Sequence, residues 1–126
     1  MADSVLLIDD DVDVLRSVGN YFEHLGYEVS RELTGEAGVS PFDRLRPEGV
    51  LLDLNLPGDT GWDLLRGPLL AAAGSPPVII TSATTVSPKR LAEFCCAGYL
   101  PKPFPLATLV ATIERLLPSR KADEHE

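Results

Sequence analysis

A chain of 126 residues, 44% of them apolar, has the size and character of one compact domain with a buried core. Its formal net charge of -8 argues against direct binding to nucleic acid or anionic lipid, because both select basic surfaces. Charged residues, glycine or proline interrupt every apolar run well short of a membrane span, and the first residues carry no basic stretch followed by an apolar run. We therefore expect a cytoplasmic domain with no direct contact to nucleic acid or membrane.

The first elements along the chain are a strand and an amphipathic helix. Residues 5–9 form a short apolar run that ends in an acid, as is typical of a strand buried on both faces of a parallel sheet. Asp11 and Asp13 fall in the first turn of the helix that follows, and Gly26 marks its end. Apolar residues recur through this helix at helical spacing, at Leu15, Val18, Phe22 and Leu25.

The middle of the chain continues the alternation less clearly. A weaker strand is expected over residues 27–31 and a buried one over residues 50–54. The helix between them, near residues 36–45, must be short or bent, because glycine and proline lie within it. Another helix is expected over about residues 61–73, interrupted by a Gly-Pro pair.

The last third of the chain predicts two more strands and two more helices. Strands are expected over residues 78–81 and 99–101, and a helix from Pro88 to about residue 96, with Ser87 as its cap. A final amphipathic helix precedes a polar tail that starts at Ser119. Its apolar stripe consists of Leu106, Leu109, Val110, Ile113, Leu116 and Leu117.

Five strands alternating with five helices imply an α/β fold with a doubly wound parallel sheet. We assign residues 1–118 to this domain and residues 119–126 to a tail or linker. In the strand order 2-1-3-4-5 the first and third strands are neighbours, and chemistry in such sheets lies beyond the carboxyl ends of the strands.

Acidic residues follow those two strands. Asp9 and Asp10 end the first strand and Asp53 ends the third, so the fold brings like charges together that repel unless a cation joins them. Only oxygen donors are present, which favours a hard ion that keeps its waters, and we expect Mg²⁺. Asp11, at the start of a helix, is better interpreted as a helix cap than as a ligand.

Four motifs, "LLIDDD", "LLDLNLPGDTG", "PPVIITSA" and "YLPKPF", occur in this order along the chain. Together they resemble the receiver domain of two-component response regulators, the CheY-like superfamily, over about residues 5–117. The resemblance implies a flavodoxin-like (βα)₅ fold. It also implies a signalling domain that assists its own phosphotransfer and dephosphorylation and is not a separate enzyme.

The resemblance assigns a phosphoacceptor and a metal site. Asp53 would accept a phosphoryl group from a phosphohistidine on a sensor histidine kinase or a phosphotransfer protein. Asp9, Asp10 and Asp53 would hold Mg²⁺, together with the backbone carbonyl of Asn55. A carboxylate can form an acyl phosphate, and phosphoryl transfer needs mainly alignment and neutralisation of charge.

The resemblance also assigns four residues around the phosphoryl group. Lys102 would be its cationic partner, Pro103 a cis-proline, Ser82 the switch hydroxyl and Tyr99 the switch aromatic. Prolines on both sides of Lys102 favour this role over that of an ordinary surface lysine.

The chain departs from the family pattern on the face expected to signal. The segment from Ser82 to Tyr99 is slightly shorter than usual, and Cys95 and Cys96 replace small residues. Thr112 stands where many DNA-binding members carry an arginine that pairs across an activated dimer. We expect a mixed-charge surface suited to a transient protein contact, and a monomer or weak dimer. Its expected side chains are Lys89, Arg90, Glu93, Thr108 and Thr112.

Other functions fit the sequence less well. A flavin-binding electron carrier would need a phosphate-binding loop after the first strand, where three aspartates repel phosphate. An aspartate-dependent phosphohydrolase would need a second acid in a D-x-D pattern and a cap over its substrate. Within the signalling class, the chain is either a receiver that controls a protein partner or the N-terminal module of a larger DNA-binding regulator.

Overall fold

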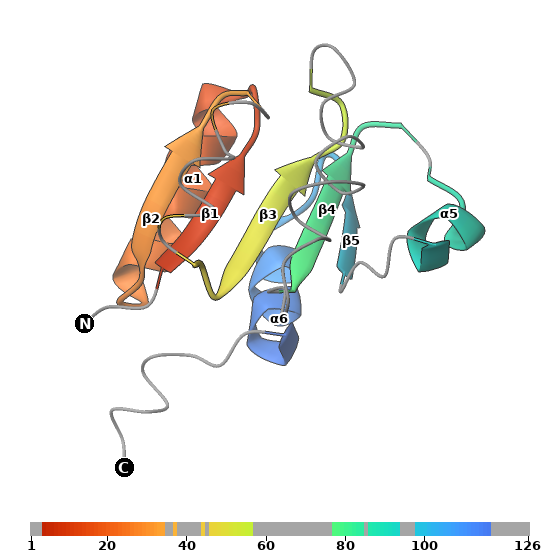
Figure 1. The fold of residues 1–126 in the computed structure, drawn as a ribbon. Helices are drawn as coiled ribbons and strands as arrows, with labels where there is room; N and C mark the ends of the chain where they lie inside the picture. The colour runs from red at the N-terminus through yellow and green to blue at the C-terminus, as the bar shows by residue number, and fades with distance from the viewer. Residues whose placement is uncertain are drawn as a thin grey trace.

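The computed structural model describes residues 4–34, 37, 44, 46–56, 77–84, 86–93 and 98–116 of the chain (Figure 1). In chain order its strands and helices are β1 (Ser4–Ile8), α1 (Val12–His24), β2 (Glu28–Glu32), β3 (Gly49–Asp53), β4 (Val78–Ser82), α5 (Pro88–Glu93), β5 (Gly98–Pro101) and α6 (Leu106–Leu116). Strands and helices alternate from β1 to β2 and from β4 to α6, as the sequence predicted, and the helices predicted between β2, β3 and β4 fall largely outside the described residues.

Some predicted features lie outside the described residues. They are most of the helix near residues 36–45, the helix over residues 61–73, the residues after Glu93 in the predicted helix with both cysteines, Leu117 of the last helix, and the tail from residue 119. Within the described part of the chain, no helix is long and apolar enough to span a membrane.

All five strands form one parallel sheet in the order β2-β1-β3-β4-β5, which confirms the predicted topology. Strand β1 pairs with β2 on one side and with β3 on the other, so the order reverses beside it. The observed strand ends differ from the predicted ones by one residue, except that the amino end of β4 and the carboxyl end of β5 are as predicted. The acid after β1 and the acid that ends β3 therefore lie at the same edge of the sheet.

Burial of the three central strands explains why their sequences are continuous apolar runs. Every residue of β1, β3 and β4 is buried, whereas the edge strand β2 is partly exposed. Strand residues on one face of the sheet join α1 and α6 in a single apolar cluster, and these helices lie behind the sheet in Figure 1. The strand side chains that point to the opposite face, such as those of Leu6 and Leu52, form a second apolar cluster there.

The boundaries of α1 agree with the capping signals in its sequence. The Asp11 carboxylate accepts hydrogen bonds from the backbone N–H groups of Asp13 at 2.9 Å and Val14 at 3.4 Å. Asp11 is thus the N-cap, as predicted. Gly26, just beyond the helix, has φ of 98°, a conformation that favours glycine.

The last helix, α6, differs from its predicted pattern at two positions. Leu109 and Ile113 are buried, but Leu106, the first helical residue, is 51% exposed and lies outside the core. Thr112, predicted on the exposed signalling face, is buried instead. Its hydroxyl donates to the Thr108 carbonyl at 2.9 Å, which satisfies the polar group while its methyl group lies close to Gly98.

Two leucines of α6 provide a matched test of this arrangement. Leu109→Ala should lower the free energy of unfolding by about 2–5 kcal/mol, because it leaves a cavity in the core. Leu106→Ala makes the same chemical change at an exposed position and should alter stability by about 0.5 kcal/mol or less. Urea denaturation of both variants measures the difference, and equal losses would contradict the observed orientation of α6.

Candidate functional site

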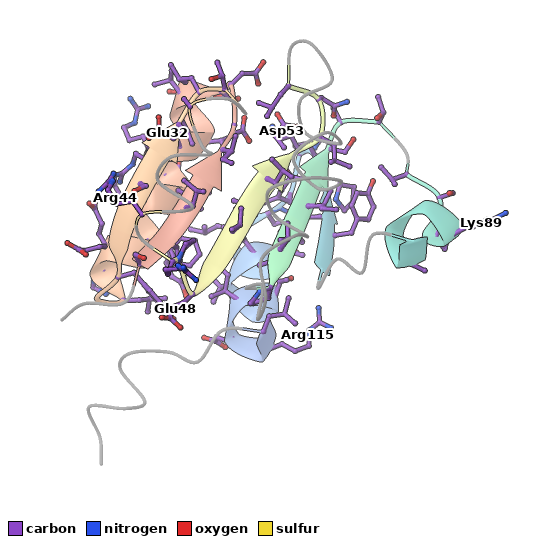
Figure 2. The ribbon with its side chains drawn as sticks, in the orientation of Figure 1. Glu32, Arg44, Glu48, Asp53, Lys89 and Arg115 are labelled. Carbon is purple, nitrogen blue, oxygen red and sulfur yellow. The ribbon has the colours of Figure 1, made fainter. Side chains whose placement is uncertain are left out.

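The carboxylates at the ends of β1 and β3 are placed by the strand register. Ile8 pairs with Leu52, so the next residues, Asp9 and Asp53, are neighbours across the two strands. Figure 2 shows Asp53 at the carboxyl end of β3, above the core of the sheet. Both side chains are buried, with only 2% of each residue exposed.

Asp10 completes the predicted acidic cluster. One carboxylate oxygen from each of Asp9, Asp10 and Asp53 lies within 4.8 Å of the others, and Asp10 is the exposed member. A Mg²⁺ ion with ligands at about 2.1 Å holds any two of them within about 4.2 Å, so small side-chain movements bring all three into reach. Asp9 Oδ2 is buried, and its partner among the described residues is the Lys102 ammonium at 2.9 Å. The oxygen-only donors of this compact cluster fit a hard divalent cation.

Lys102, which follows β5, reaches both buried carboxylates. Its Nζ lies 2.9 Å from Asp9 Oδ2, 3.2 Å from Asp9 Oδ1 and 3.1 Å from Asp53 Oδ2. The backbone N–H of Lys102 donates to the Ser82 carbonyl at 2.8 Å, which joins the ends of β5 and β4. The peptide bond between Lys102 and Pro103 is cis, the isomer that the family resemblance implies. The predicted cation therefore stands beside the predicted acids.

Backbone N–H groups orient the two buried acids. Asp11 donates its backbone N–H to Asp9 Oδ1 at 2.9 Å, and Asn55 donates its own to Asp53 Oδ1 at 2.8 Å. Each acid thus accepts a hydrogen bond from the residue two positions later. One oxygen of Asp53 is held by this amide and the other faces Lys102.

Burial and charge act in opposite directions on these groups. Burial raises the pKa of the Asp9 carboxyl above its ordinary 3.8, although the Asp11 N–H and Lys102 both favour its charged form. Burial lowers the pKa of the Lys102 ammonium, but its contacts with Asp9 and Asp53 outweigh this effect and leave the pKa raised. Lys102 is therefore protonated, whereas a negative charge on Asp9 is unfavourable because its carboxylate is buried.

The predicted switch residues lie in a hydrogen-bonded network at the end of β4. Ser82 Oγ is 2.9 Å from Asn55 Oδ1, 2.9 Å from the Thr84 carbonyl and 3.0 Å from Thr84 Oγ1. Asn55 Oδ1 also accepts from the Ala83 N–H at 2.7 Å. The Tyr99 hydroxyl donates to the Thr84 carbonyl at 3.3 Å. Ser82 and Tyr99 therefore both form hydrogen bonds with Thr84.

Sequence reasoning missed two parts of this network. Thr84 was not singled out, and Asn55 was considered only for its backbone carbonyl. The available signal was the placement of Thr84 two residues beyond the expected switch hydroxyl, where a second hydroxyl can bond back to the loop. Thr84 Oγ1 also lies 3.4 Å from Asn55 Nδ2.

The charge at Asp9 generates a pH-dependent prediction for the metal-free protein. A carboxyl whose pKa is raised on folding contributes stability below its unfolded pKa and loses it as pH rises through the folded value. Asp9→Asn should therefore be more stable than the parent at pH 7, with the difference shrinking as pH falls toward 3.8. Urea midpoints in chelator across this range measure the effect.

Glu48→Gln is the control, because it removes the same charge at an exposed position. It should change the midpoint little at any pH. A destabilised Asp9→Asn protein at neutral pH would mean that the pairing with Lys102 outweighs the burial of Asp9.

Comparisons with known proteins agree with the fold and site. Residues 5–114 match the family model described as the response regulator receiver domain. The chain is 37% identical over 120 residues to the transcriptional regulatory protein PrrA of Mycobacterium leprae, covering 94% of this chain and 51% of that protein. It is 30% identical over 125 residues to the sensory transduction protein RegX3 of Mycobacterium bovis, covering 98% of this chain and 54% of RegX3. The chain thus spans about half the length of these relatives.

Solved structures agree at the level of the fold. The chemotaxis protein CheY4 of Vibrio cholerae superposes with a TM-score of 0.81 at 25% identity, covering 93% of this chain and all of CheY4. The BeF₃-activated DrrB receiver domain gives a TM-score of 0.78 at 27% identity, covering 93% of this chain and 98% of DrrB. With the acidic cluster and Lys102 at the expected edge of the sheet, these matches show that the chain belongs to the receiver-domain family of two-component response regulators.

Proposed function

We propose that Asp53 is phosphorylated in a Mg²⁺-dependent reaction by a sensor histidine kinase or phosphotransfer protein in the cytoplasm, and that this controls an output. The observation that carries the proposal is the meeting of Asp9, Asp10 and Asp53 with Lys102 at one edge of the sheet. We assign this role to residues 1–118, with residues 119–126 as a tail or linker. On this proposal the chain is a signalling domain and not a separate enzyme.

The residues proposed to hold Mg²⁺ are Asp9, Asp10, Asp53 and the backbone carbonyl of Asn55. The bound ion would neutralise charge on the transferring phosphoryl oxygens. The compact arrangement of three carboxylates, whose negative charge the single Lys102 ammonium does not balance, supports this assignment.

In the proposed transfer, an Asp53 oxygen forms a bond to phosphorus. The P–N bond of the phosphohistidine breaks, and its electron pair remains on the imidazole nitrogen. The Asn55 N–H fixes the Asp53 carboxylate, and the Lys102 ammonium, already 3.1 Å from Asp53 Oδ2, is close enough to turn toward an incoming phosphoryl oxygen. The same groups would assist hydrolysis of the acyl phosphate.

The proposed response begins at Ser82. Its hydroxyl would turn to a phosphoryl oxygen, and Tyr99 would move into the space released near Thr84. The contacts of both Ser82 and Tyr99 with the Thr84 carbonyl support a coupled movement.

Acetyl phosphate tests the phosphoacceptor. With Mg²⁺ the protein should gain the mass of one phosphoryl group, and Asp53→Asn or a chelator should abolish the gain, because nucleophile and charge neutralisation are both required. Asp13→Asn, which removes an exposed carboxylate on α1, should be modified normally. Intact mass measures all four samples. Modification that persists in Asp53→Asn would refute the assignment.

A second candidate is the N-terminal module of a larger DNA-binding regulator. PrrA, about half of which this chain covers, is named a transcriptional regulatory protein, which favours an attached output domain. In that arrangement the receiver domain itself would still make no direct contact with DNA, because the chain is acidic.

For either output, we propose that the activated surface comprises α5, β5 and α6. Exposed charges on it include Lys89 and Arg115, which Figure 2 labels on α5 and α6. Thr112 is buried and lacks a guanidinium group, so it cannot make the paired contacts that an arginine would. The side chains of Arg90 and Glu93 lie outside the described residues.

Sedimentation tests the expected monomer or weak dimer. Adding beryllofluoride and Mg²⁺ should leave the sedimentation coefficient near that of a monomer at micromolar concentrations, because an arginine-paired interface cannot form through Thr112. A tight activated dimer that the double variant Lys89→Glu, Arg115→Glu dissociates would contradict this proposal.

A further inference from the structure

Asn55 has two separate sets of contacts. Its backbone N–H supports Asp53, while its side-chain amide crosses to the loop after β4. There Oδ1 accepts from Ser82 Oγ at 2.9 Å and from the Ala83 N–H at 2.7 Å, and Nδ2 donates to Thr84 Oγ1 at 3.4 Å. One exposed asparagine thus contacts three consecutive residues.

The orientation of this amide follows from its partners. A backbone N–H can only donate, so the atom facing Ala83 must be the amide oxygen. The same oxygen then faces the Ser82 hydroxyl, which can donate to it. The amide NH₂ group is left to meet Thr84 Oγ1, an acceptor.

The Ser82 hydroxyl can move only if its present hydrogen bonds break. The hydroxyl has a single proton, and Asn55 Oδ1 and the Thr84 carbonyl both lie at 2.9 Å as acceptors. To donate to a phosphoryl oxygen, Ser82 must withdraw this one proton from the two acceptors that share it. Ala83 and Thr84 are held by the same amide, so the loop that also receives the Tyr99 hydroxyl is fixed with it.

We propose that the side-chain amide of Asn55 is a positioning group that stabilises the unphosphorylated arrangement of Ser82, Ala83 and Thr84 and thereby opposes activation. This inference rests on the proposed function, because it takes Ser82 to be the hydroxyl that binds the phosphoryl group. Asn55 would then act twice: its backbone carbonyl favours metal binding, and its side chain holds the switch in the resting position.

Asn55→Ala separates the two roles, because it keeps the backbone carbonyl and removes the amide. At saturating Mg²⁺ it should bind beryllofluoride about 2- to 12-fold more tightly than the parent, the range that one net hydrogen bond supplies. Asn20→Ala is the matched control, an exposed asparagine on α1 whose amide meets Arg31 and not the switch. Its affinity should equal that of the parent. Titrations followed by amide spectra measure each constant.

A double-mutant cycle with Ser82→Ala tests whether Asn55 acts through Ser82. With the hydroxyl gone, Asn55→Ala should tighten binding by less than in the parent, because only the bonds to Ala83 and Thr84 are left to release. An unchanged or weaker affinity of Asn55→Ala in the parent background, or an equal gain in the Ser82→Ala background, would overturn the inference. Failure of the parent itself to bind beryllofluoride with Mg²⁺ would instead overturn the proposed function.

Discussion

The pairing of two buried carboxylates with one ammonium is the constraint on which this site depends. Asp9 and Asp53 lie side by side at 2% exposure each, and Lys102 contacts both of them. Their like charges repel strongly in a partly desolvated cleft, and one lysine neutralises only half of their charge. The exposed carboxylate of Asp10 adds to the excess. The folded protein therefore holds excess negative charge that a bound divalent cation would neutralise.

The parallel sheet makes this arrangement possible without long loops. Strand β3 lies between β1 and β4, so the acids at the ends of β1 and β3 are neighbours, and β5 is one strand beyond β4. Lys102 reaches back across β4 to these acids, while its backbone N–H binds the Ser82 carbonyl. A backbone hydrogen bond thus joins the residue that carries the ammonium to the end of β4, where Ser82, the proposed switch residue, lies.

Much of this architecture could be predicted from the sequence, because it depends on local patterns. Buried central strands require continuous apolar runs, and acids that end such strands must share an edge of the sheet. Thr112 was misplaced because apolar periodicity ignores a hydroxyl that binds a carbonyl one turn earlier, as this one does to Thr108. The Asn55 amide was missed because its contacts with Ser82 and Ala83 span 27 and 28 residues, and no local pattern encodes such a pairing.

The hydrogen bonds around Ser82 bear on how completely such a switch can respond. A ligand shifts a conformational equilibrium only by its difference in affinity for the two states. If Ser82 is the switch hydroxyl, as proposed, each bond that it makes with Asn55 and Thr84 adds to the free energy that a phosphoryl group would have to supply. A loop with fewer such bonds would leave the domain partly active without its signal. One with more would keep it silent after phosphorylation. Asn55 and Thr84 are exposed, so water can replace their hydrogen bonds. Each bond therefore contributes only a small amount to the free-energy difference between the two arrangements.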